Sequence, residues 1–183
     1  MPNGFLVVET SVPRANRLGI GTYKGLYRTP GWSQKAYEAG FDDPLVFGNY
    51  TNSDGLILTL AGAREVQDLF RRANPMLNLE VIWTRERGST YPAPRGSKFL
   101  GIDIASKAPF WSVIADPPSD PFVNESKSRL NANALFEKED DARRYLHDYR
   151  SSHPDKSGIF LTLWDVYSVN AHETVPSDSL LDA

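Results

Sequence analysis

Residues 99–120 read FLGIDIASKAPFWSVIADPPSD, and this stretch decides which fold the chain can adopt. Its two apolar runs are separated by a short polar break, a pattern typical of antiparallel strands joined by a turn. Asp103 lies within the first run, and Asp116 ends the second. Because side chains alternate between the two faces of a strand, Asp103 points away from Ile102 and Ile104. We therefore expect Asp103 on the solvent-exposed face of a hairpin.

A strand with an aspartate, a turn and a second strand also resembles the opening of the RNase H-like and actin-like folds, in which that aspartate binds a metal. Two carboxylates can share one Mg²⁺. Asp103 paired with Asp165 or Asp116 is therefore an alternative site, which would hydrolyse a phosphoester. Those folds need further strands and helices after the hairpin, and only 80 residues follow Asp103. We accordingly assign no catalytic residue, no metal and no cofactor.

Two segments on either side of the hairpin resemble each other at an offset of 79 residues. AGAREVQDLFRRANP, residues 61–75, places its apolar side chains on one face of a helix and ends in a proline. EKEDDARRYLHDYR, residues 137–150, also has an apolar stripe and is followed by Pro154; its acids come first and its bases last, as the helix dipole favours. An apolar strand with a tryptophan, Trp83 or Trp164, follows each helix. This repetition is open to two explanations, duplication or convergence on one packing solution.

Apolar runs elsewhere complete the fold prediction. We expect strands at Phe5–Val8, at Leu56–Leu60, at residues 77–84 and at residues 158–169. Together with the hairpin they predict an α+β domain over residues 1–170: a mainly antiparallel sheet with two main helices on one face, built as two similar helix–strand units. We expect residues 171–183 to form a disordered tail.

The composition narrows the function. The chain has 183 residues, 40% of them hydrophobic, and no cysteine. The lack of cysteine fits a cytoplasmic location, and no apolar run approaches the roughly 18 residues that span a membrane. The net charge of −3 argues against nucleic acid as a partner. Acidic residues concentrate after residue 100, which predicts an acidic surface in the second half.

The order of segments from about residue 55 to 170 resembles that of bacterial immunity proteins, which are encoded beside secreted toxins in polymorphic-toxin and contact-dependent systems. The resemblance lies in the pattern of LEVIWTRE, FLGIDIASKAPFWSVI, LNANALFEKEDDARRYLHDY and WDVYSV. It implies a cytoplasmic, non-enzymatic module that binds and neutralises a cognate protein toxin, and it carries over no functional residue.

Two surfaces are therefore candidates for binding. The first would face a basic toxin cleft and comprises Trp111 and seven acids: Asp116, Asp120, Glu125, Glu137, Glu139, Asp140 and Asp141. The second combines arginines and aromatic residues in loops, where a regulatory domain would bind a small ligand. Its residues are Tyr27, Arg28, Trp32, Arg87 and Tyr91.

Overall fold

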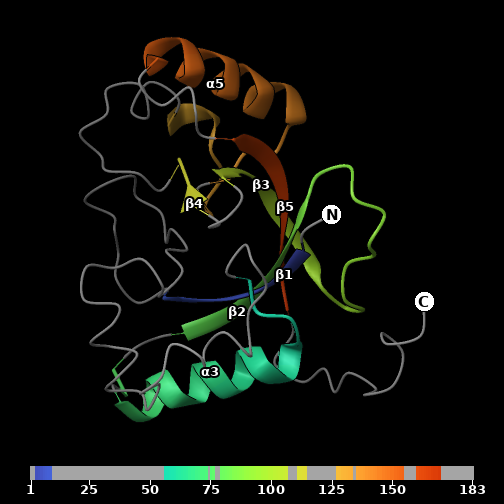
Figure 1. The fold of residues 1–183 in the computed structure, drawn as a ribbon, viewed down its shortest axis with the longest axis vertical. Coiled ribbons are helices and arrows are strands. Elements are labelled where there is room, and N and C mark those ends of the chain that lie inside the picture. Colours follow the sequence, from blue (N-terminus) through green and yellow to red (C-terminus); the bar gives the residue numbers. More distant parts are fainter. Residues whose placement is uncertain are drawn as a thin grey trace.

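An antiparallel sheet with two helices forms the centre of the molecule (Figure 1). The computed structural model describes residues 3–9, 56–73, 75–76, 79–106, 111–114, 127–133, 135–154 and 160–169. The strands are β1 (Asn3–Glu9), β2 (Leu79–Glu86), β3 (Lys98–Ser106), β4 (Trp111–Ser112) and β5 (Leu161–Ser168), in the spatial order β1-β2-β5-β3-β4. All four neighbouring pairs are antiparallel. The predicted α+β fold is confirmed.

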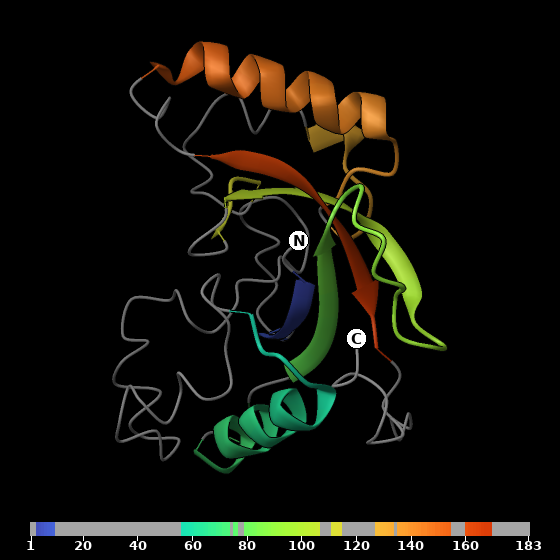
Figure 2. The same ribbon diagram turned by 45° about the vertical axis from the view of Figure 1, so that its right-hand side comes forward.

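The helices α3 (Leu60–Ala73) and α5 (Glu139–Ser152) lie near opposite ends of the strongly twisted sheet (Figure 2). A short 3-10 helix, η3 (Lys127–Arg129), precedes α5. The backbone N–H of Gly62 donates to Thr59 Oγ1 at 3.0 Å, so Thr59 caps α3. Three acids occupy the first turn of α5, where the helix dipole stabilises negative charge. None of the described helices is long and apolar enough to cross a membrane.

Both helices cover the same face of the sheet. Leu60, Ala63 and Val66 of α3 pack on Phe5, Val7 and Val81. Ala142, Tyr145 and Tyr149 of α5 pack on Ile102, Ile104 and Leu163. Directly paired residues share a face, and the pairs Phe5–Trp83, Trp83–Tyr167 and Phe99–Tyr167 connect the two ends. The expected placement of both helices on one face is therefore confirmed.

The other face of the sheet is buried as well, which overturns one prediction. Leu6, Ile82, Trp164 and Val166 form a core there, covered by Leu56 and Leu135 from the segments that precede the helices. Asp103 pairs with Trp164 on this face and has no solvent-exposed surface. The prediction that Asp103 is exposed was wrong, because alternation identifies the face of a side chain but not whether that face meets water.

The two helix–strand units are closely equivalent. Each helix has 14 residues, at an offset of 79, and each following strand has eight, at an offset of 82. Before each helix one residue bridges to a strand that flanks the β2–β5 pair: Ile57 exchanges two backbone hydrogen bonds with Phe5 of β1, and Phe136 exchanges two with Ile102 of β3. We call the described residues between 3 and 86 unit 1 and the described residues between 98 and 168 unit 2. The register of β2 with β5 relates them by a local two-fold axis at the Thr84–Val166 pair.

A glycine allows each bridge to approach its strand. A Cβ on Gly4 would lie 2.7 Å from Leu56 Cβ and 2.8 Å from the Ile57 oxygen. A Cβ on Gly101 would lie 2.6 Å from Leu135 Cβ and 3.0 Å from the Phe136 oxygen. Gly101 also has φ +146°, which L residues rarely adopt. The same close contact is thus built twice.

The repeat differs from the sequence prediction in two details. The offset of 82 places Trp164 at the position of Ile82, so the two tryptophans are not equivalent: Trp83 packs against α3, and Trp164 lies on the opposite face. The strand expected at Leu56–Leu60 is reduced to the single bridge of Ile57, because α3 already begins at Leu60. The tail expected at residues 171–183 lies outside the described residues.

Candidate functional site

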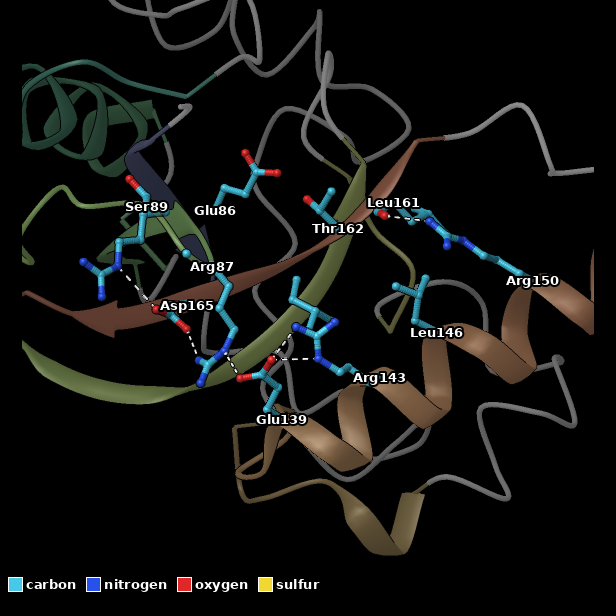
Figure 3. Close-up of a pocket in the computed structure, with 13 residues that line it drawn as sticks. Glu86, Arg87, Ser89, Glu139, Arg143, Leu146, Arg150, Leu161, Thr162 and Asp165 are labelled. Atoms are coloured by element: carbon cyan, nitrogen blue, oxygen red, sulfur yellow. Dashed lines mark hydrogen bonds and ion pairs between the residues drawn. The ribbon is translucent and has the colours of Figure 1, made fainter.

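An open groove of about 640 Å³ lies between the end of β2, the middle of β5 and the side of α5 (Figure 3). Four arginines and three acids are among the residues that line it: Arg85, Arg87, Arg143, Arg150, Glu86, Glu139 and Asp165. The offset of 82 between the strands places Asp165 at the position of Trp83, and the offset of 79 between the helices places Glu139 at the position of Leu60. Where unit 1 has apolar core, unit 2 therefore has charge.

Asp165 is the buried centre of this site, with a side chain only 7% exposed. The residue pairs directly with Arg85 across β2 and β5, and Arg85 Nε donates to Asp165 Oδ2 at 3.3 Å. Arg87 Nη1 donates to Asp165 Oδ1. A buried charge is stable only when it is paired and hydrogen-bonded. The two arginines satisfy this condition by binding one carboxylate oxygen each.

Glu139 extends the network to α5 (Figure 3). Arg87 Nε donates to Glu139 Oε2 at 2.8 Å, and Arg143 Nε donates to Glu139 Oε1 at 2.7 Å. These hydrogen bonds, first that of Arg87 and then that of Arg143, lower the pKa of Glu139. Burial opposes the charge of Arg87, but Glu139 and Asp165 outweigh it, so the pKa of Arg87 is raised. The network holds the first turn of α5 against the end of β2.

Aromatic residues surround Arg85 at the edge of the groove. Its guanidinium carbon lies 5.9 Å from the ring centre of Trp83 and 5.7 Å from that of Tyr167. Arg85 Nη2 donates to the Tyr167 hydroxyl at 3.3 Å, and Nη1 donates to the Tyr91 carbonyl. The ring of Phe99 packs edge-on against that of Tyr167, with the ring centres 5.4 Å apart. We call Tyr91, Phe99, Tyr167 and Arg85 the aromatic–arginine patch, in which Tyr91 is 48% and Phe99 43% exposed.

The predicted acidic surface is only partly described. Asp116, Asp120 and Glu125 lie outside the described residues, and the side chain of Trp111 does too. Glu137 and Asp140 are exposed, and Asp141 is half-buried at the start of α5. Glu139 binds two arginines, so its charge is neutralised within the chain. The groove is lined by more arginines than acids, whereas the sequence predicted an acidic surface for the second half of the chain.

Of the predicted ligand loops, Tyr27, Arg28 and Trp32 lie outside the described residues. Arg87 lines the groove, and Tyr91 belongs to the aromatic–arginine patch. Sequence reasoning missed Arg85, Arg143, Arg150 and Tyr167. An alignment of the two units with the offset of 82 would have shown Asp165 at an apolar position, and an acid there requires a cation beside it.

Asp103 forms a separate buried polar feature. Its Oδ1 accepts hydrogen bonds from Ser112 Oγ and from the Ile104 backbone N–H, both at 2.7 Å. Its Oδ2 has no hydrogen-bond partner among the described residues. Burial raises the pKa of Asp103 to about 7, although the hydrogen bonds from Ser112 and Ile104 act in the opposite direction. The offset that relates Gly4 to Gly101 places Asp103 at the position of Leu6, a third acid at an apolar position.

A shared metal between Asp103 and Asp165 does not fit the geometry. Asp165 pairs with Ile102 on the helix-covered face, whereas Asp103 pairs with Trp164 on the opposite face. Carboxylates on opposite faces of a sheet cannot ligate one ion. The part of the chain that is described holds no group of three or more acids or histidines able to bind a metal. Asp116, the other proposed partner of Asp103, is outside that part.

Comparison with protein-family models, with curated proteins and with solved structures found no match for this chain. The inference of function therefore depends on the groove and on the aromatic–arginine patch beside it.

Proposed function

We propose that this chain is a non-enzymatic protein-binding module whose interface is centred on the aromatic–arginine patch. The observation that carries the proposal is the exposure of Phe99 and Tyr91 beside Arg85 and Tyr167. Aromatic residues and arginine are the types that contribute most binding energy in protein interfaces. Arg85 is already held by Asp165 and Tyr167, so little side-chain entropy is lost when a partner covers it.

The groove beside the patch supports a protein partner rather than a small substrate. It is open along its length, its lining is mostly polar, and most of its charged groups bind one another. Sites for small molecules are usually concave and mostly apolar. A shallow polar surface next to exposed aromatic rings is instead typical of the rim and centre of a protein interface.

The resemblance to immunity proteins supplies the finer proposal. In this proposal the chain acts in the bacterial cytoplasm and blocks a cognate toxin by covering its active site. Complementary charge speeds such encounters, and a few desolvated anchors supply most of the affinity. Phe99 and Tyr91 are the proposed anchors.

A binding and rescue experiment tests this proposal. The chain is co-expressed with the product of a neighbouring toxin gene, and survival and the dissociation constant are measured for the unchanged chain and for Tyr91→Ala with Phe99→Ala. We expect rescue by the unchanged chain and affinity weakened about 100-fold in the double variant. The bond from Arg85 to Tyr91 is made to the backbone, so Tyr91→Ala leaves that acceptor in place.

The matched control is Leu58→Ala, which truncates another exposed apolar side chain, 57% exposed, in unit 1. It should bind and rescue as the unchanged chain does. Equal losses for the control and the patch variant would contradict the placement of the interface, and the absence of both binding and rescue would contradict the immunity role.

A further inference from the structure

The α5 wall of the groove presents cationic side chains around one apolar residue. Arg143, Leu146 and Arg150 line the groove and also a second hollow of about 380 Å³, which continues along α5 to His147 and Ser151. In Figure 3, Arg143, Leu146 and Arg150 extend from α5 on the side of the groove. The two arginines therefore flank Leu146 along a surface that is continuous beyond the groove.

The charge of this wall is positive even though the groove contains acids. Glu139 and Asp165 each bind two arginines, so these acids lie between cations of the same chain. The Arg143 side chain remains 64% exposed, and Arg150 is exposed while one of its nitrogens donates to the Leu161 carbonyl at 3.0 Å. Both side chains are therefore within reach of a partner, and carboxylates are the groups that guanidinium groups bind with two parallel hydrogen bonds.

The spacing of the two arginines limits what would fit. Arg143 and Arg150 are seven residues apart on one helix, which corresponds to about 10 Å along its axis. A second helix lying alongside α5 would present its own residues i and i+7 at the same spacing, with residue i+3 or i+4 between them on the same face. An acid, an apolar residue and an acid in this pattern would meet Arg143, Leu146 and Arg150 in turn.

We propose that the groove and the adjoining α5 surface bind an amphipathic helix of the partner protein, with carboxylates at i and i+7 and an apolar residue between them. This proposal rests on the proposed binding function and names the chemistry of the partner. It reverses the expectation drawn from the acid-rich second half, because Glu139 at the groove is paired within the chain, while the side chains of Arg143 and Arg150 remain exposed.

Fluorescence anisotropy with a designed helical peptide tests the proposal. The labelled peptide carries Glu at i and i+7 and Leu at i+3, and a second peptide replaces both Glu residues with Gln. We expect the Glu peptide to bind at least about tenfold more tightly than the Gln peptide. The difference should shrink at high salt, because exposed charge interactions are screened.

Variants of the full chain locate the binding. Arg143→Glu with Arg150→Glu should weaken binding of the Glu peptide by about tenfold or more. The matched control is Arg144→Glu with Arg72→Glu, since these arginines are also exposed and helical but lie outside both hollows; it should change affinity less than about twofold. Arg143→Glu alone serves as a second variant, because it keeps the bond from Arg150 to Leu161 that supports the fold.

Equal binding of the two peptides, or equal loss in the control variant, would overturn the proposal. So would displacement of the Glu peptide by inorganic phosphate at the concentration of the peptide itself, because that result identifies a small-anion site. Toxin rescue that depends on Phe99 but not on Arg143 or Arg150 would refute the helix and leave the protein-binding function standing. Specific peptide binding without any toxin rescue would support the helix and contradict the immunity role.

Discussion

The described parts of unit 1 and unit 2 share one backbone plan, but at three buried apolar positions of unit 1 an acid stands in unit 2. Leu6, Leu60 and Trp83 of unit 1 are buried in apolar clusters. Their equivalents in unit 2 are Asp103, Glu139 and Asp165. Buried or half-buried acids stabilise a fold less well than apolar residues of similar size. At these positions the apolar residues of unit 1 stabilise the fold. The acids of unit 2 stabilise it less and provide polar groups instead.

The largest expected effect tests whether the two bridges are equivalent. We expect Gly101→Ala to lower the free energy of unfolding by about 3–5 kcal/mol, because it combines an unfavourable φ with a clash against the backbone. Gly4→Ala should cost less, about 1–3 kcal/mol, since it meets a comparable clash without the added strain at positive φ. Denaturant unfolding measures both. Equal costs would show that the strain at Gly101 is relieved by a shift of the chain.

The second prediction concerns the pH dependence that Asp103 adds to unit 2. Its pKa is about 7 in the folded chain and 3.8 in the unfolded chain, so the folded state retains a proton that the unfolded state releases. Stability should therefore fall as pH rises from about 4 to about 7, by a few kcal/mol in total. Asp103→Asn mimics the neutral acid and should remove this fall. Unfolding titrations of both proteins across this range check it, and identical slopes would contradict the buried acid.

The third prediction concerns how much the ion pairs of Asp165 contribute to the free energy of unfolding. Asp165→Ala leaves Arg85 and Arg87 without their shared acceptor. The expected loss is about 2 kcal/mol, below that of a fully buried pair because both arginines are partly exposed. Double-mutant cycles with Arg87→Ala measure the coupling, and a cycle with no coupling energy would show that the network contributes nothing to stability.

The smallest expected effect is the loss of stability when an arginine in the last turn of either helix is truncated. Arg71 Nη2 donates to the Leu79 carbonyl and Arg150 Nη2 to the Leu161 carbonyl, each at 3.0 Å. The Leu79 carbonyl also accepts from Gln67 Nε2 at 2.6 Å. We expect Arg150→Ala to cost about 1 kcal/mol and Arg71→Ala about half of that, because Gln67 still satisfies the carbonyl. Thermal unfolding of both variants checks the order, and a larger loss for Arg71→Ala would contradict it.

Much of the fold could be predicted because its signals are local. Helical spacing in residues 61–75 and 137–150 and apolar runs at the strands identify α3, α5, β2 and β5 with errors of a few residues. The offset between the helices also follows from the sequence, because Ala63 and Ala142 occupy the same buried position. The offset between the strands does not, because the segments after the two helices differ in length.

The site could not be predicted in the same way, because it depends on distant contacts. Arg85 and Asp165 meet only through the register of β2 with β5. Asp103 lies on a face where Leu56 and Leu135, distant in the sequence, join a buried core, whereas alternation alone assigns that face to solvent. Arg87, Tyr91 and Glu139 were expected at a binding surface, Arg87 and Tyr91 on one surface and Glu139 on another.

The bridges have a consequence for how the molecule meets other chains. Ile57 binds both backbone polar groups of Phe5 on β1, and Phe136 binds those of Ile102 on β3. β4 continues this cover along β3 to Ser106. An uncovered strand is a template for aggregation and for strand addition by another protein. At these positions the sheet offers no such template, so a partner that approaches Phe5 of β1 or residues 102–106 of β3 meets side chains rather than unpaired backbone groups.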